Sequence, residues 1–139
     1  MAARLSFTSV LATDVVALSA FYADLFGLDG VPSLDSPHFR GLRSERVVIG
    51  FSGPNAYELL NLPHPATADA GVHSFLTFDV DGPDAVDAAT DRAVALGATL
   101  RWGPGQTYYG AHQSTLLDPE GNAFRINYLT IQEVEPPPE

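Results

Sequence analysis

Residues 6–12, SFTSVLA, and residues 74–80, SFLTFDV, each begin a segment with the same order of features. Each is followed by an apolar stripe at helical spacing, which predicts helices over 15–26 and 83–96 that end before Gly27 and at Gly97. Residues 56–62, AYELLNL, and 123–129, AFRINYL, then match as late strands. Because self-similarity along a chain reflects repeated structure, we predict that the chain folds as two copies of one structural repeat. This alignment makes four positions equivalent: Phe7, Glu58, Phe75 and Arg125.

The composition limits the class of protein. A chain of 139 residues with 45% apolar residues suits one folded domain, or two small modules that share a core. No apolar run is long enough to cross a bilayer, and the N-terminus lacks a secretion pattern, so we expect a cytoplasmic protein without a membrane partner. The absence of cysteine excludes disulfides and thiolate chemistry.

The charge is strongly negative. There are 17 acidic and 7 basic residues, a net charge of −10, and every basic residue is arginine. An acidic surface repels phosphate backbones, so nucleic acid is not an expected partner. The simplest role of the acidity is solubility, and the absence of lysine excludes Schiff-base chemistry.

The predicted fold class is α+β, with two βαβββ modules. Residues 1–62 form the first module and 73–130 the second; 63–72, rich in proline and small residues, form a linker, and 131–139 a solvated tail. In each module a strand and a helix precede about three strands, which form an open curled mixed sheet with the helix on its outer face. Residues 118–122, DPEGN, are typical of a hairpin turn.

Alternation along the predicted strands separates two faces. The apolar face, which packs under the helices, collects Val10, Tyr57, Leu59, Leu76, Phe78, Val80, Phe124, Ile126 and Tyr128. The second face mixes aromatic, polar and charged side chains: Phe7, Ser9, Leu11, Glu58, Leu60, Phe75, Thr77, Asp79, Arg125 and Asn127. Such a mixture is typical of a cavity wall.

Three motifs occur in a fixed order: residues 21–28, FYADLFGL, after Asp14; residues 77–80, TFDV; and residues 117–122, LDPEGN. Together they resemble the signatures of the vicinal oxygen chelate superfamily, which includes glyoxalase I, bleomycin-resistance proteins and extradiol dioxygenases. The resemblance covers roughly residues 5–130. It implies paired βαβββ modules around a ligand cavity, formed within one chain or across a homodimer, with the homodimer as the family habit.

Metal-using members of this superfamily take their ligands from the first and late strands of each module. The resemblance places those ligands here at Phe7, Glu58, Phe75 and Arg125. Phenylalanine has no donor atom and arginine is a permanent cation, so only Glu58 is competent, and a catalytic metal usually needs about three protein ligands. We therefore expect no metal cofactor. One alternative is that a register slip brings in His73.

The individual site residues leave alternatives open. Phe7 and Phe75 either line a cavity or pack in the core, and Glu58 and Arg125 either form an ion pair between the modules or face water at a rim. Ser9, Thr77 and Asn127 share the mixed face, and Trp102, Tyr108, Tyr109 and His112 belong to the stretch that would wall the cavity and stack on a planar ligand. For Trp102, partly buried packing is an equal alternative. Arg40, Arg43 and Arg46 either meet an anionic ligand or form a solvated strand edge.

Three functions remain. The preferred one is a metal-free protein that binds a small hydrophobic or aromatic molecule between the modules, as bleomycin-resistance proteins do. The second is a metal-independent isomerase or lyase with Glu58 as general base and His112 as its candidate helper. The third is a metal-dependent glyoxalase or dioxygenase with a ligand set that the sequence does not display.

Overall fold

The computed structural model describes residues 2, 4–65, 71, 72 and 74–129. The chain divides into two compact units, Met1–Gly71 and Val72–Glu139, called unit 1 and unit 2 below. This division falls inside the expected 63–72 linker. The expected tail, 131–139, and His73 lie outside the described residues. None of the described helices combines the length and the apolarity needed to cross a bilayer.

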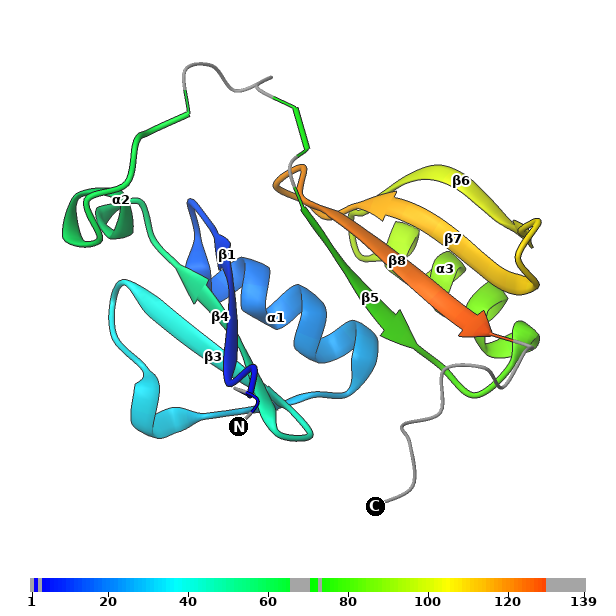
Figure 1. The fold of residues 1–139 in the computed structure, drawn as a ribbon, viewed down its shortest axis with the longest axis horizontal. Coiled ribbons are helices and arrows are strands. Elements are labelled where there is room, and N and C mark those ends of the chain that lie inside the picture. The colour runs from blue at the N-terminus through cyan, green and yellow to red at the C-terminus, as the bar shows by residue number, and fades with distance from the viewer. Residues whose placement is uncertain (1, 3, 66–70, 73, 130–139) are drawn as a thin grey trace. The chain divides into compact units, whose positions relative to one another are not determined.

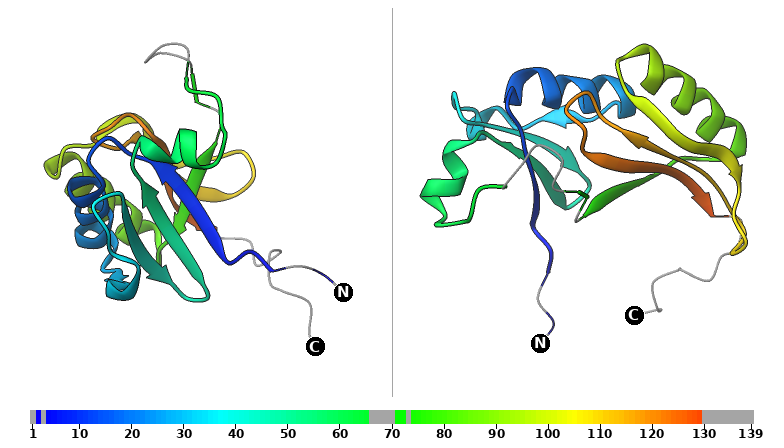
Figure 2. Two further views of the ribbon diagram at one scale, coloured as in Figure 1. Left: turned by 90° about the vertical axis from the view of Figure 1, so that its left-hand side faces the viewer. Right: turned by 90° about the horizontal axis from the view of Figure 1, so that it is seen from above.

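Unit 1 is a four-stranded mixed sheet with one long helix against one face (Figures 1 and 2). The strand order is β1-β4-β3-β2, with β1 parallel to β4 and the other pairs antiparallel. In chain order its elements are β1 (Phe7–Leu11), α1 (Val15–Phe26), β2 (Asp29–Gly30), the 3-10 helix η1 (Pro32–Leu34), β3 (Phe39–Ser44), β4 (Val47–Ser52) and the short helix α2 (Asn55–Leu59).

Unit 2 repeats this plan without the short helices. Its strand order is β5-β8-β7-β6, again with the first strand parallel to the last, and α3 covers one face. The elements are β5 (Phe75–Asp79), α3 (Pro83–Ala95), β6 (Thr99–Gln106), β7 (Ala111–Leu117) and β8 (Ala123–Leu129). Two open mixed sheets, each with a helix on one face, confirm the predicted α+β class and the βαβββ plan.

The helix boundaries follow from local chemistry. The carboxylate of Asp14 accepts a hydrogen bond from the Ala17 amide at 3.0 Å and so caps the start of α1. Gly27 ends α1 with φ of +66°, the left-handed conformation that glycine adopts without a Cβ clash. Pro83 starts α3 at a position whose amide needs no acceptor. Both helices predicted from the sequence are confirmed.

The core of each unit lies between its helix and its sheet. In unit 1, Tyr22 of α1 stacks on Phe51 of β4 with ring centroids 5.5 Å apart. In unit 2, Phe124 and Ile126 of β8 and Val86 of α3 have no exposed surface. Burying such side chains supplies most of the stability of a domain this small.

One predicted strand is wrong. Residues 56–62 do not join the sheet: α2 begins after Pro54, and the Leu59 side chain is 77% exposed. The place that this late strand was predicted to take is filled by β4, which pairs in parallel with β1 and in antiparallel with β3. Tyr57 and Leu59 are consequently absent from the packed face on which the alternation predicted them.

Two strands of unit 2, β6 and β7, are long and form a hairpin. β6 runs to Gln106, and β7 already begins at Ala111. Shifts of register at Trp102 and Gly105 let β6 continue through a Gly-Pro-Gly stretch that would ordinarily end a strand. The hairpin over residues 118–122 is confirmed, with the buried Asp118 carboxylate accepting the amides of Glu120 at 2.9 Å and Asn122 at 3.0 Å.

A hydroxyl pair links α3 to β7 inside the core of unit 2. The Thr90 hydroxyl donates to the Val86 carbonyl at 2.7 Å, and the Ser114 hydroxyl lies 2.7 Å from the same Thr90 oxygen. Thr90 has one proton, which goes to Val86, so Ser114 must be the donor within the pair. Both side chains are buried, Thr90 at 1% exposure and Ser114 at 0%.

This direction predicts an asymmetry between two substitutions. Thr90→Val leaves the buried Ser114 hydroxyl without an acceptor and should lower the free energy of unfolding by about 1–3 kcal/mol. Ser114→Ala leaves Thr90 bonded to Val86 and should lower the free energy of unfolding by only about 0.5–1.5 kcal/mol. The double variant should be less destabilised than the sum of the two single effects, because it leaves no buried hydroxyl without an acceptor. Urea unfolding of the four proteins measures this, and equal single effects that add would contradict the assignment.

Candidate functional site

The candidate site is the face of the unit 2 sheet that points away from α3, called the open face below. Directly paired residues share a face, so the register fixes its members. Its central row runs from Thr77 on β5 through Arg125 on β8 and Thr115 on β7 to Trp102 on β6. A row on one side holds Phe75, Ala123, Leu117 and Thr99, and a row on the other holds Asp79, Asn127, Gln113 and Gly105.

Arg125 is held in place at the centre of the open face. Its Nε donates to the Thr77 hydroxyl at 3.0 Å and its Nη1 to the Tyr109 hydroxyl at 3.3 Å. The Tyr109 hydroxyl in turn donates to Oε1 of Gln113 at 3.0 Å. The guanidinium carbon lies 4.9 Å from the centre of the Phe75 ring, a cation–π arrangement.

No carboxylate neutralises this arginine within the described residues. Arg125 takes part in neither of the contacts between Arg40 and Asp35 and between His112 and Asp87, the second of which is an ion pair only when His112 is protonated. Asp79 lies on the open face, but its carboxylate accepts from the Asn127 amide at 3.0 Å. The open face thus carries one oriented cation beside exposed aromatic rings, with Phe75 at 55% and Trp102 at 48% exposure.

Comparison of the two registers corrects the predicted set of equivalent positions. Phe75 pairs with Ala123 and Thr77 with Arg125; in unit 1, Phe7 pairs with Val48 and Ser9 with Gly50. The counterpart of Arg125 is therefore Gly50, and the assignment of that position to Glu58 is wrong. Glu58 lies exposed on α2, outside both sheets. The error arose because a second alternating segment follows the true last strand.

A phenylalanine ring occupies the space beside Gly50. A Cβ at Gly50 would lie 2.7 Å from two carbons of the Phe39 ring and 3.3 Å from the Ser9 hydroxyl. Ser9, Gly50 and Gly41 form one row across β1, β4 and β3. The row in unit 1 that matches the Arg125 row is thus nearly bare of side chains and is covered by Phe39.

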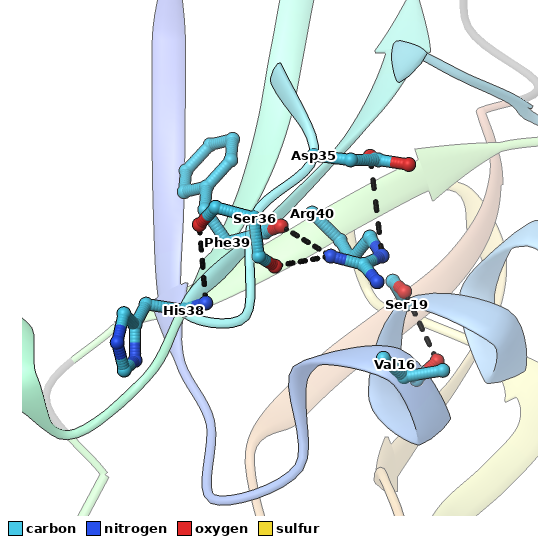
Figure 3. A network of polar contacts seen from close by, with 7 residues as sticks. All are labelled: Val16, Ser19, Asp35, Ser36, His38, Phe39 and Arg40. Atoms are coloured by element: carbon cyan, nitrogen blue, oxygen red, sulfur yellow. Dashed lines mark hydrogen bonds and ion pairs between the residues drawn. The ribbon is translucent and has the colours of Figure 1, made fainter. Parts of the chain in front are cut away.

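Arg40 fixes the turn that carries Phe39 (Figure 3). Its Nη1 donates to the carbonyls of Ser36 and Phe39, the latter at 2.9 Å, and its Nε lies 3.9 Å from the Asp35 carboxylate. The His38 amide donates to the Ser36 hydroxyl at 3.1 Å. Arg40 was predicted either to contact an anionic ligand or to form a solvated strand edge. The structure favours neither role, because its guanidinium contacts residues 35, 36 and 39 of the adjoining turn.

Two of the predicted wall residues lie elsewhere. His112 pairs with Tyr128 on the helix side of the sheet, and its Nε2 lies 2.8 Å from the Asp87 carboxylate of α3. Placing it on the ligand wall was wrong: alternate residues of a strand point to opposite faces, and the open-face residues of β7 are Gln113, Thr115 and Leu117. Tyr108 is fully exposed in the loop after β6 and contacts Tyr109 edge-on, with ring centroids 5.1 Å apart.

The side chains at the two pairs of equivalent positions, Phe7 with Phe75 and Gly50 with Arg125, are unsuited to binding a metal ion. Phe7, Gly50, Phe75 and Arg125 offer no lone pair for a divalent cation. Among the described residues, no three His, Asp or Glu side chains are grouped so as to bind one.

A family model described as a glyoxalase-like domain matches residues 7–127, which include both sheets. The chain belongs to the glyoxalase-like family. This agrees with the resemblance to the vicinal oxygen chelate superfamily. A crystal structure of a glyoxalase/bleomycin resistance protein/dioxygenase family enzyme from Burkholderia phytofirmans PsJN is 46% identical, with a TM-score of 0.85 over 90% of this chain and 98% of that one.

More distant glyoxalase-like structures share the fold alone. A lactoylglutathione lyase from Agrobacterium tumefaciens is 23% identical, with a TM-score of 0.67 over 91% of this chain and 93% of that one. A fosfomycin resistance protein from Listeria monocytogenes is 16% identical, with a TM-score of 0.68 over 96% of both chains. No protein with a curated description matches this chain.

The sequence held a signal for Gly50 that the alignment of late strands overlooked. In unit 2 a tight turn directly precedes the last strand. In unit 1 the matching turn is at Glu45-Arg46, with Glu45 at φ of +52°, directly before the apolar run 47–51. Aligning the strands that follow these two turns, rather than the final alternating segments, matches β4 with β8, and the pairing registers then make Gly50 the equivalent of Arg125.

The packing of Phe39 on Gly50 predicts strong coupling between the two positions. Gly50→Ala should lower the free energy of unfolding by about 1–3 kcal/mol, because the new methyl group overlaps the ring. In a Phe39→Ala background the same change should be nearly neutral. Gly30→Ala, where the nearest atom to a new Cβ is 4.0 Å away, is the matched control. Additive effects in thermal unfolding would contradict the contact.

Proposed function

We propose that this protein binds a small, planar, largely apolar molecule on the open face of unit 2 without a metal ion. The observation that carries the proposal is the residue set at the four equivalent positions, which offers no metal ligand, beside a face that keeps exposed aromatic rings. Exposed Phe75, Trp102 and Tyr109 on a sheet face supply flat surfaces on which a conjugated ring gains stacking and burial energy.

The polar groups of this face suit selective binding. The hydroxyls of Thr77 and Tyr109 and the amides of Gln113 and Asn127 lie among the aromatic rings, already connected by hydrogen bonds. Side chains held in this way lose little conformational freedom when a ligand arrives, which favours affinity.

The alternative with Glu58 as general base gains no support from the structure. Glu58 is an exposed residue of α2, and His112, its suggested helper, is bonded to Asp87 on the helix side of unit 2. The names of the distant enzymes carry no substrate over, because similarity at 16–23% identity shows the fold alone. The function proposed for this chain is therefore binding rather than turnover.

Trp102 provides a direct test, because it is the single tryptophan of the chain. Titration with naphthoquinone should quench its emission saturably, whereas the saturated bicyclic diketone of similar size should have little effect. Phe75→Leu should weaken binding by about threefold to tenfold, the value of an aromatic contact, and Val94→Ala, an exposed apolar change on α3, should not. Equal binding of the flat and saturated compounds would contradict the proposal.

The same protein tests the metal-free mode. Dialysis against a chelator should leave the naphthoquinone affinity unchanged, and the ligand should be recovered chemically intact after long incubation. Stoichiometric zinc, nickel, manganese or iron in elemental analysis of the purified protein would overturn metal-free binding, and conversion of the ligand would establish an enzyme.

A further inference from the structure

We propose that the natural ligand is an organic anion, an aromatic or otherwise flat acid whose carboxylate is held by Arg125. This inference rests on the proposed function and names the chemical class of ligand that the same face would select. It starts from an unusual state of one side chain: Arg125 is oriented by its neighbours and has no counter-charge in the described part of the chain.

The hydrogen bonds of Arg125 leave most of its donors available. A guanidinium has five N–H groups in a planar fork. One on Nε goes to Thr77 and one on Nη1 goes to Tyr109, and Nη2 makes no hydrogen bond within the described residues. Three N–H groups therefore remain, in the arrangement that binds a carboxylate with two parallel hydrogen bonds.

The neighbours orient the cation without neutralising it. Thr77 and Tyr109 accept from it as neutral hydroxyls, and the Phe75 ring contacts its face. In a protein with a net charge of −10, an arginine near the middle of a sheet face would ordinarily be expected to meet a carboxylate. The positive charge of Arg125 is instead available to a ligand on the open face.

The rows on either side of Arg125 set the orientation of the ligand. Phe75, Ala123 and Leu117 form an apolar row on one side, and the Asp79 carboxylate lies in the row on the other. Trp102 lies two strands from Arg125, roughly 10 Å across the sheet. A bound acid would place its carboxylate on Arg125 and its flat body over Leu117 toward Trp102, away from the negative charge of Asp79.

A matched pair of probes tests this inference: naphthalene carboxylate and naphthalene carboxamide, which share the ring system and differ in charge. Binding followed by Trp102 emission and by amide chemical shifts should favour the carboxylate by about tenfold or more, the value of a charge-assisted hydrogen bond. Arg125→Gln should abolish this preference, because it should lower the carboxylate affinity far more than the carboxamide affinity. Arg4→Gln, at an exposed position before β1, is the matched charge control.

Two further variants sharpen the test. Arg125→Lys keeps the charge but loses the fork, so it should retain only part of the preference. Asp79→Asn should act in the opposite direction and tighten carboxylate binding by about twofold to threefold, because it removes a negative charge about 7 Å along the sheet from the Arg125 row. Thermal unfolding of each variant confirms that the fold is intact.

The outcomes separate this inference from the proposed function. Equal affinity for carboxylate and carboxamide, or a preference that survives Arg125→Gln in a folded variant, would overturn the anion site and leave aromatic binding standing. Binding of neither these probes nor naphthoquinone would overturn the proposed function, and the anion site with it.

Discussion

The parallel pairing of the first strand with the last strand of each unit determines the rest of the structure. It places β1 beside β4 and β5 beside β8, so that residues far apart in the sequence become direct neighbours. The helix between them must then cover one face, which leaves the other face for side chains that no core requires. Thr77 and Arg125 meet on that second face because of this register, and a shift by one residue would turn Arg125 into the core.

The two units use this common frame differently. In unit 2 the central row carries a cation, two hydroxyls and the Trp102 ring, whereas in unit 1 the matching row is built from Ser9, Gly50 and Gly41 under the Phe39 ring. One repeat is thus chemically rich and the other nearly bare. The two units thus share a fold while differing in the side chains of this row, and a site is defined by its residues and not by the fold that carries them.

The sequence predicted what depends on local signals. The apolar stripe of α1, its Asp14 cap and Gly27, and the turn before β8 all specify their elements through neighbouring residues. It failed where the answer depends on pairing between distant strands: alternation over 56–62 suits a strand, but β4 already fills the place between β1 and β3 that the late strand was predicted to take. The same limit explains His112, since the face of a strand residue follows from register and not from its position near an aromatic cluster. Arg125, Phe75 and Thr77 were predicted together because alternation alone places them on one face.

The contact between Phe39 and Gly50 has an evolutionary consequence. A carboxylate at position 50 would require a Cβ where the ring now lies, 2.7 Å from two of its carbons. A larger residue at position 50 would therefore require the Phe39 ring to move or a second change at Phe39. Steric epistasis of this kind makes this row of unit 1 harder to alter than its lack of side chains suggests.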